Sequence, residues 1–258
     1  MGFQHPPIPF FRIHWRTKRP TVIQTPDSTL SVIIPTRNEA ARIGSLVEHL
    51  RATSPLPADR IVVSDGGSTD ATGAIVEQLG ATFLPSPRAG RAGQMNYAAE
   101  RSDAEVLYFV HADCTPPATW YDDIQNALRE DYQYGLFSYR FDSNNPMLRI
   151  NERFVRFDNR MLGGGDQTFF IRRELFRAEG MYRENCCIME DFDFFWRIKR
   201  RHPFKLILND VLVSARKYEE NSWLRVQLAN LMAITCFQTG WLTRPQIKQL
   251  YQRMLRTG

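Results

Sequence analysis

The amino-acid sequence predicts an α/β domain with a mostly parallel central sheet, flanked by helices and followed by amphipathic C-terminal helices. Short apolar, β-branched segments alternate with segments whose hydrophobic residues recur at helical spacing. This alternation is typical of parallel sheets covered by helices on both faces. The chain has 258 residues, 43% of them hydrophobic, which is enough for a sizeable core. Polar clusters follow several predicted strands, where such sheets bind ligands.

The elements follow one another at regular spacing. Residues 30–34 form an apolar, β-branched run before Pro35, the pattern of a buried strand. Apolar residues within 39–51 then recur at helical spacing. The same reasoning predicts strands at 60–64, 81–85, 105–111, 134–141 and 168–172, and helices at 71–79, 147–162, 190–201, 222–238 and 244–256. We divide the chain into an N-terminal arm (1–29), the α/β domain (30–217) and a C-terminal helical appendage (218–258).

The charge is distributed unevenly. Residues 30–198 hold eighteen basic and twenty-four acidic residues, a net charge of −6, whereas residues 1–29 carry +3 and residues 199–258 carry +8. A nucleic-acid-binding protein clusters positive charge on its reading surface, so an acidic middle argues against nucleic acid as a partner. The pattern fits a metal-holding centre with basic ends that lie near anionic lipid.

The chain shows no feature of a secreted or membrane-spanning protein. Its four cysteines have no paired metal-ligand spacing, no secretory signal precedes them, and we expect them to be reduced in a cytoplasmic protein. No run reaches the roughly 18 apolar residues of a spanning helix. The apolar stripe within 222–238 predicts a core or homodimer contact, and nearby tryptophans and basic residues leave a peripheral contact with the inner membrane face as an alternative.

Asp65 ends the second predicted strand and precedes two glycines. The glycines let the chain turn sharply and approach a ligand. A carboxylate at this position can accept hydrogen bonds from a ribose or a nucleobase. An Asp–Gly turn without a ligand has the same sequence. No G-x-G-x-x-G follows the first strand, which argues against a dinucleotide-binding dehydrogenase.

His111-Ala-Asp113 closes the most apolar predicted strand. Alternate residues of an extended segment point the same way, so both side chains are expected to face one ion. Imidazole and carboxylate together suit Mn²⁺ or Mg²⁺, and phosphate oxygens of a substrate normally fill the open positions. A strand-end aspartate that caps the following helix is the alternative.

Three acidic residues open the predicted helix at 190–201: Glu190, Asp191 and Asp193. Carboxylates at a helix N-terminus gain about 0.3–1 kcal/mol from its partial positive charge, so capping alone explains them. A carboxylate held ionised in a cleft also suits a general base, which contributes about 10²–10⁴-fold in rate. The spacing of the three residues does not show which of them would act as the base.

Two basic clusters and a glycine run complete the candidate residues. Arg88 and Arg91 lie in a glycine-spaced segment leading into a helix, a pattern that favours phosphate binding. Residues 163–167 read Gly-Gly-Gly-Asp-Gln and permit close backbone approach to a ligand. Arg216 and Lys217 lie beyond the last strand and are candidates to close over a diphosphate. Ordinary surface residues would give the same pattern as the arginine and lysine candidates, and a flexible connection would give the same pattern as the glycine run.

In this order, the motifs resemble the family-2 glycosyltransferases of the GT-A fold. The resemblance runs from about Leu30 to Lys217 and rests on LSVIIPTRNEA, IVVSDGGSTDAT, GRAGQMNYA, HAD, GGGDQTFFIRRELF and MEDFDFFWRI. HAD, GGGDQ and ED together are most similar to a bacterial subgroup named for neighbouring radical-SAM and selenium-related genes. The chain departs from the family pattern at His111, where many relatives carry aspartate.

The resemblance implies a fold, a reaction and a site. The donor would be a nucleotide-diphospho-sugar, the acceptor an unidentified hydroxyl, and the cofactor Mn²⁺ or Mg²⁺. The implied site residues are Pro35, Thr36, Glu39, Asp65, Arg91 and Asp113 for the nucleotide-sugar; Asp113 and His111 for the metal; Gly164, Gly165, Gln167 and Glu190 for the acceptor or donor-sugar side; Arg216 and Lys217 for the diphosphate; and Asp191 as general base.

The implied reaction is a single displacement that inverts the configuration at C1 of the sugar. Two alternatives stay open from the sequence. One is a binding protein with a degenerate site that holds a nucleotide or an anionic lipid without chemistry. The other is a retaining transferase on the same fold.

Overall fold

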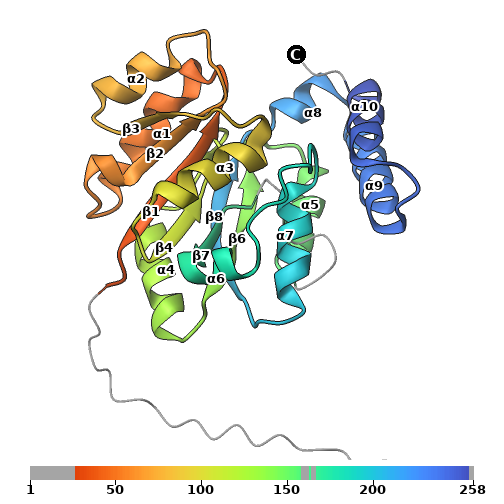
Figure 1. Cartoon of the computed structure of the whole chain (residues 1–258). Coiled ribbons are helices and arrows are strands. Elements are labelled where there is room, and N and C mark those ends of the chain that lie inside the picture. Colours follow the sequence, from red (N-terminus) through yellow and green to blue (C-terminus); the bar gives the residue numbers. More distant parts are fainter. Residues whose placement is uncertain (1–26, 158–162, 164–166, 256–258) are drawn as a thin grey trace, which may run out of the picture.

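An eight-stranded mixed sheet forms the centre of the molecule (Figure 1). The computed structural model describes residues 27–157, 163 and 167–255. The strands are β1 (Leu30–Thr36), β2 (Ile61–Asp65), β3 (Thr82–Pro85), β4 (Val106–Phe109), β5 (Cys114–Thr115), β6 (Tyr134–Phe141), β7 (Phe169–Arg172) and β8 (Lys205–Val213). Their order is β3-β2-β1-β4-β7-β6-β8-β5. Strands β3, β2, β1 and β4 are parallel to one another, and β6 is parallel to β8. Strand β7 runs antiparallel to both of its neighbours, β4 and β6, and β5 runs antiparallel to β8.

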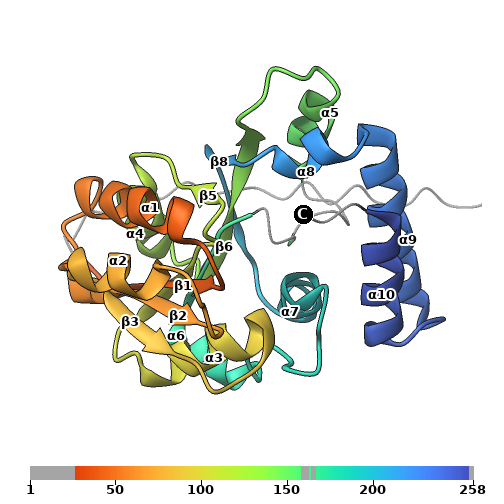
Figure 2. The same ribbon diagram turned by 90° about the horizontal axis from the view of Figure 1, so that it is seen from above.

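Helices cover both faces of this sheet, which confirms the predicted fold class. Viewed from above, α1, α4 and α5 lie on one face and α3, α6 and α7 on the other (Figure 2). The helices are α1 (Ala40–Ala52), α2 (Thr72–Gln78), α3 (Gly90–Arg101), α4 (Trp120–Arg129), α5 (Leu148–Phe154), α6 (Arg173–Ala178), α7 (Glu190–Lys199), α8 (Arg216–Glu220), α9 (Trp223–Thr239) and α10 (Arg244–Met254), with a short 3₁₀ turn, η1, at Ala58–Arg60.

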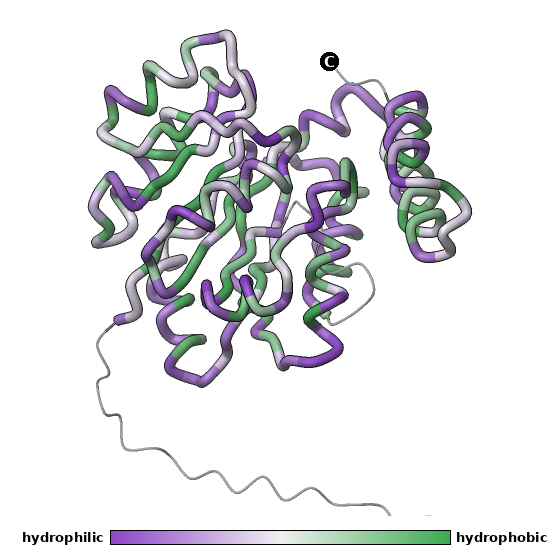
Figure 3. Tube along the Cα trace, viewed as in Figure 1, coloured by the Kyte–Doolittle hydropathy of each residue, from purple (hydrophilic) through white to green (hydrophobic). Residues whose placement is uncertain are grey.

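The core lies between the sheet and its helices. All seven residues of β1 and all four of β4 are buried, as expected for strands covered on both faces. The hydropathy of the chain follows the same division, with hydrophobic strands at the centre and hydrophilic segments around them (Figure 3). Buried aromatic rings fill the side of the sheet near α4, where Tyr108 stacks on Trp120 at 5.0 Å between ring centroids.

Two local predictions were wrong, and one long strand was missed. Strand β4 ends at Phe109, and a turn follows in which Cys114 N–H donates to the carbonyl of His111 at 3.0 Å. Helix α5 ends at Phe154, well before residue 162. Strand β8 was not predicted, because Asn209 and Asp210 interrupt its apolar run; the structure places them at a register shift between β6 and β8.

Helices α9 and α10 pack against each other beside the main sheet (Figure 1). Val226, Ala229 and Leu255 form their small buried cluster. The predicted stripe of α9 is therefore divided: Val226 and Ile234 are buried, whereas Leu228 and Leu231 are exposed. Among the described helices, none has the length and apolar character needed to cross a membrane.

Candidate active site

Three parallel strands end side by side at one edge of the sheet. Thr36, the last residue of β1, is in register with Asp65, the last residue of β2. Pro35 precedes it, opposite Ser64. The chain beyond β4 continues alongside β1, because Val110 N–H donates to the carbonyl of Ile33 at 3.0 Å. The segment from His111 to Asp113 therefore leaves the sheet next to the Thr36–Asp65 pair.

Asp65 is almost fully buried and shapes the loop that follows it. Its carboxylate accepts hydrogen bonds from the backbone N–H of Gly67 and of Ser68, at 2.9 and 2.8 Å. The hydroxyls of Ser68 and Thr36 also donate to it. With four donors from the protein itself, Asp65 fixes the backbone at this edge. Its direct contact with a nucleotide stays a prediction.

The loops after β1 and β2 are bonded to each other. Asn38 adopts a left-handed conformation with φ of 57°; its backbone N–H donates to the Ser68 hydroxyl at 2.7 Å, and its side chain accepts from Thr69 N–H at 2.8 Å. Glu39 precedes α1, and its carboxylate pairs with Arg42 at 3.3 Å. The contacts of Asn38 hold the loops after β1 and β2 in a fixed position relative to each other.

Helix α3 is anchored to the same edge by Gln94, a residue that the sequence did not single out. Its buried side-chain amide donates to the carbonyls of Thr36 and Ser64, at 2.6 and 3.1 Å. One turn earlier, Arg91 Nε pairs with the carboxylate of Glu190 at 2.8 Å. The Glu190 side chain is only 3% exposed. Arg91 thus joins this edge of the sheet to the first residue of α7.

His111 and Asp191 face each other from opposite sides of the site. The imidazole Nε2 lies 3.7 Å from the Asp191 carboxylate, and both side chains are largely buried. Burial disfavours the imidazolium, but contact with Asp191 outweighs it and raises the pKa of His111. Burial likewise favours the neutral acid, yet His111 and Arg91 lower the pKa of Asp191. Asp191 is therefore held ionised.

Asp113 is exposed on the turn that follows His111. The expectation of an extended segment carrying both side chains was wrong, because residues 111–114 form that turn. Asp113 still lies close enough for its charge to contribute to the raised pKa of His111. No group of three or more metal-ligating side chains occurs within the described part of the chain. A cation here would need oxygen ligands from a substrate.

The structure separates the three acidic residues of α7. Asp193 is buried, and the guanidinium groups of Arg183 and Arg244 both approach its carboxylate at 3.1 Å, with Arg197 at 3.8 Å. Its charge is neutralised by structural partners, and Arg244 belongs to α10. Asp193 therefore joins α7 to the C-terminal helices, whereas Asp191 faces the site.

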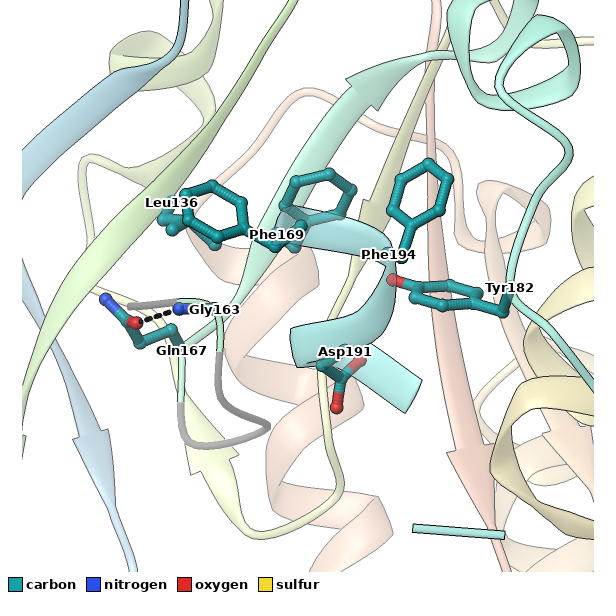
Figure 4. Close-up of a pocket in the computed structure, with 8 residues that line it drawn as sticks. Leu136, Gly163, Gln167, Phe169, Tyr182, Asp191 and Phe194 are labelled. Atoms are coloured by element: carbon teal, nitrogen blue, oxygen red, sulfur yellow. Dashed lines mark hydrogen bonds between the residues drawn. The ribbon is translucent and has the colours of Figure 1, made fainter. Parts of the chain in front are cut away.

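A small, mainly apolar pocket lies beside Asp191 (Figure 4). Its wall includes Tyr182, which the sequence did not single out, and whose ring centroid lies 5.1 Å from that of Phe194. Gln167 also lines it, but its amide is used internally: it accepts from Gly163 N–H at 2.9 Å and donates to the Phe137 carbonyl at 3.1 Å. Gly164 and Gly165 lie outside the described residues.

Two of the basic candidates are engaged elsewhere. Arg88 forms a two-pronged ion pair with Glu100, at 2.8 and 2.9 Å, and also contacts Glu184. The ammonium group of Lys217 contacts the hydroxyl of Tyr251 in α10. Arg216 is exposed just after Ser214, whose N–H donates to the carbonyl of Asp113 at 3.1 Å. Of the two residues expected at the diphosphate, Arg216 is the one whose side chain has no hydrogen-bond or ion-pair partner among the described residues.

A model of the family described as glycosyl transferase family 2 matches residues 31–198, which include every part of this site except residues 214–217. The chain belongs to glycosyl transferase family 2. The predicted family is thereby confirmed.

Curated relatives support the same family. The succinoglycan biosynthesis protein ExoA of Rhizobium meliloti is 36% identical over 106 residues, which make up 39% of this chain and 31% of that protein. An uncharacterized glycosyltransferase of Rickettsia felis is 30% identical over 113 residues, or 44% of this chain and 36% of that one. The matches thus span about a third of these relatives' lengths.

Solved structures share the fold of this family-2 chain at low sequence identity. The mannosyltransferase PcManGT from Pyrobaculum calidifontis, in complex with GDP-Man and Mn²⁺, superimposes with a TM-score of 0.60 at 20% identity, covering 88% of this chain and 69% of that one. Glucosyl-3-phosphoglycerate synthase from Mycobacterium tuberculosis, in complex with Mn²⁺, UDP and glucosyl-3-phosphoglycerate, has a TM-score of 0.55 at 18% identity, with 80% of each chain covered. The GT-A fold is therefore confirmed.

Proposed function

We propose that the protein transfers a sugar from a nucleotide-diphospho-sugar to an acceptor hydroxyl with inversion at C1, and that Asp191 is the general base. The observation that carries this proposal is the position of Asp191. It is held ionised between His111 and Arg91, at the edge where β1, β2 and β4 end. Ligands of open α/β sheets bind at this edge.

The donor would lie across the loops after β1, β2 and β4. Pro35, Thr36, Glu39 and Asp65 shape the nucleotide side, and Arg91 with Arg216 supplies positive charge for the diphosphate. Two structural relatives in complex with Mn²⁺ and a nucleotide or nucleotide-sugar support this arrangement. Lys217 would take part only after leaving Tyr251.

Asp113 is the residue that best fits a divalent cation, because its carboxylate is exposed and suits Mn²⁺ or Mg²⁺. His111 would join it only as the neutral imidazole, after giving up its contact with Asp191 at 3.7 Å, and diphosphate oxygens would complete the shell. Such a cation stabilises negative charge on a leaving diphosphate when it is bound. The exposed position of Asp113 leaves room for the substrate side of that shell.

In the chemical step, the acceptor oxygen forms a bond to C1 while the bond from C1 to the diphosphate oxygen breaks. The acceptor proton passes to the Asp191 carboxylate, and the nucleoside diphosphate leaves. A lowered pKa makes Asp191 a weak base, so its placement beside the acceptor must supply much of its effect. Tyr182, at the adjoining pocket, is positioned to orient a sugar or acceptor hydroxyl.

The finer parts of the assignment are also proposals. We assign the transferase domain to residues 30–217, with an arm before it and a helical appendage after it. The motifs HAD, GGGDQ and ED favour the radical-SAM- and selenium-associated subgroup, and the four free cysteines favour a reducing compartment such as the cytoplasm.

A panel of UDP- and GDP-sugars tests the proposal directly. The purified protein with Mn²⁺ is expected to release nucleoside diphosphate slowly by hydrolysis from one donor, and nuclear magnetic resonance of the released sugar is expected to show the opposite anomer. Release with retained configuration would identify a retaining enzyme. Binding of a donor without any release, even with a range of hydroxyl acceptors, would contradict the proposed activity.

A further inference from the structure

The large exposed apolar side chains of the described chain all belong to its second half. Among the described residues, every large hydrophobic side chain that is exposed lies between residues 147 and 241. Four of them follow one another along α5 and the turn after it: Met147, Ile150, Phe154 and Phe157, of which Phe154 and Phe157 are 60% and 63% exposed. Three more form a stripe on α9: Leu224, Leu228 and Leu231.

Basic side chains alternate with the apolar ones on α5. Leu148 and Val155 point into the core, whereas Arg149 and Arg153 are exposed on the outer side. Neither arginine forms an ion pair with another residue in the described ranges. The neighbouring Arg156, by contrast, is held by Asp210 at 2.7 Å. The outer side of α5 is thus both apolar and positively charged.

Asn151 links α5 to α8 and the start of α9. Its side chain donates to the Tyr218 hydroxyl at 2.9 Å and accepts from Trp223 Nε1 and Gln227 Nε2 at 3.3 and 3.1 Å. Trp223 and Gln227 each precede an exposed leucine of α9 in the sequence. Helix α5 accordingly lies next to α8 and the start of α9 (Figure 2). We define the α5–α9 surface as Met147, Arg149, Ile150, Arg153, Phe154, Phe157, Leu224, Leu228 and Leu231.

We propose that the α5–α9 surface docks on an anionic lipid bilayer. Aromatic and aliphatic side chains at this surface would enter the boundary between headgroups and acyl chains, while the arginines reach the anionic headgroups. This choice of partner rests on the alternation along α5 of exposed phenylalanines with arginines that form no ion pair within the described ranges. A two-fold contact between copies of the chain is less suitable, because self-complementary packing brings the same arginines of both copies into one interface.

Docking in this way would place the pocket beside Asp191 near the lipid headgroups. Gly163, which lines that pocket, lies six positions after Phe157 of the proposed surface in the sequence. A hydroxyl acceptor carried by a membrane lipid would then approach Asp191 from the bilayer. Docking itself requires neither donor nor turnover, so it can fail or succeed independently of the proposed transfer reaction.

Flotation of the full chain with vesicles tests the surface. We expect the protein to float with vesicles of phosphatidylcholine containing about one third phosphatidylglycerol, at low salt, and to bind pure phosphatidylcholine far more weakly. Because each arginine near an anionic surface contributes about fivefold in partitioning, Arg149→Ser with Arg153→Ser should reduce binding about 25-fold. Phe154→Ser with Phe157→Ser should reduce it more than tenfold by removing buried apolar area.

Matched controls keep the test specific. Arg51→Ser with Arg200→Ser removes the same charge elsewhere, and Trp241→Ser removes an 80% exposed aromatic side chain outside the surface; both should float like the wild type. Circular dichroism and nucleotide-induced thermal shifts check that every variant is folded.

Absence of flotation with anionic vesicles at low salt would overturn the proposal, as would equal loss of vesicle binding in surface and control variants. A concentration-dependent dimer that Phe154→Ser with Phe157→Ser dissociates, without vesicle binding, would reassign the surface to a second copy.

Discussion

The edge formed by β1, β2 and β4 and the α5–α9 surface lie in one chain but expose opposite kinds of groups. At the edge, backbone and side-chain hydrogen bonds join neighbouring loops, and Asp65 alone accepts four of them. Within residues 27–146 the large hydrophobic side chains are buried or partly buried, whereas residues 147–241 contain all of those that the described chain leaves exposed. The edge is preorganised for a polar ligand, and the later region offers an apolar, basic surface. Under the proposed function, donor and acceptor would approach the protein from these two different environments.

Replacement of Asp191 by Asn is expected to have the largest effect on turnover. The change removes the proposed base at nearly constant size, so transfer should fall by about 10²–10⁴-fold. Donor affinity should persist, since the nucleotide contacts lie at the β1–β2–β4 edge. Radiolabelled sugar transfer and equilibrium binding measure the two quantities. Near-normal turnover would remove Asp191 from its assigned role.

Replacement of Asp193 by Asn, two residues further along α7, should affect stability instead. The substitution leaves Arg183, Arg197 and Arg244 without their shared carboxylate, and breaking a buried ion-pair group costs about 3–5 kcal/mol of unfolding free energy. Urea unfolding measures the loss. If Asp193→Asn were as stable as the wild type but inactive, the roles that we assign to the two carboxylates would be reversed.

Replacement of Tyr182 by Phe should give the smallest effect. Its hydroxyl lines the pocket and donates to no described residue, so its loss should leave the free energy of unfolding nearly unchanged. If the hydroxyl orients a substrate, kcat/KM should fall about two- to tenfold, the equivalent of one hydrogen bond. Tyr108→Phe is the control, because the buried Tyr108 hydroxyl bonds Thr168 at 2.8 Å and its loss should lower stability without a specific effect on kcat/KM. Unchanged kcat/KM in Tyr182→Phe would exclude the orienting role.

The sequence predicted the edge formed by β1, β2 and β4 better than the later region. Buried parallel strands have continuous apolar runs in the sequence, and topology alone places the residues that follow them at one edge. Asp65 and the segment from His111 to Asp113 could therefore be assigned to the same edge, where the structure has them. Partners of long side chains depend on the tertiary fold. Nothing local in the sequence shows that Lys217 meets Tyr251 or that Arg244 meets Asp193. Gln94 and Tyr182 were missed for the same reason, since a buried amide or phenol resembles any core residue in the sequence.

A thermal-shift titration with UDP and GDP, in the presence and absence of Mn²⁺, tests most directly whether the β1–β2–β4 edge is a metal-assisted donor site. One nucleoside diphosphate at about 100 times its dissociation constant should stabilise the wild type by about 2.7 kcal/mol with Mn²⁺. Most of that stabilisation should disappear without the metal and in Asp113→Ala, whereas the control variant Asp122→Ala should respond like the wild type. A Mn²⁺-dependent shift of equal size in Asp113→Ala, or no shift with any nucleoside diphosphate, would contradict the account.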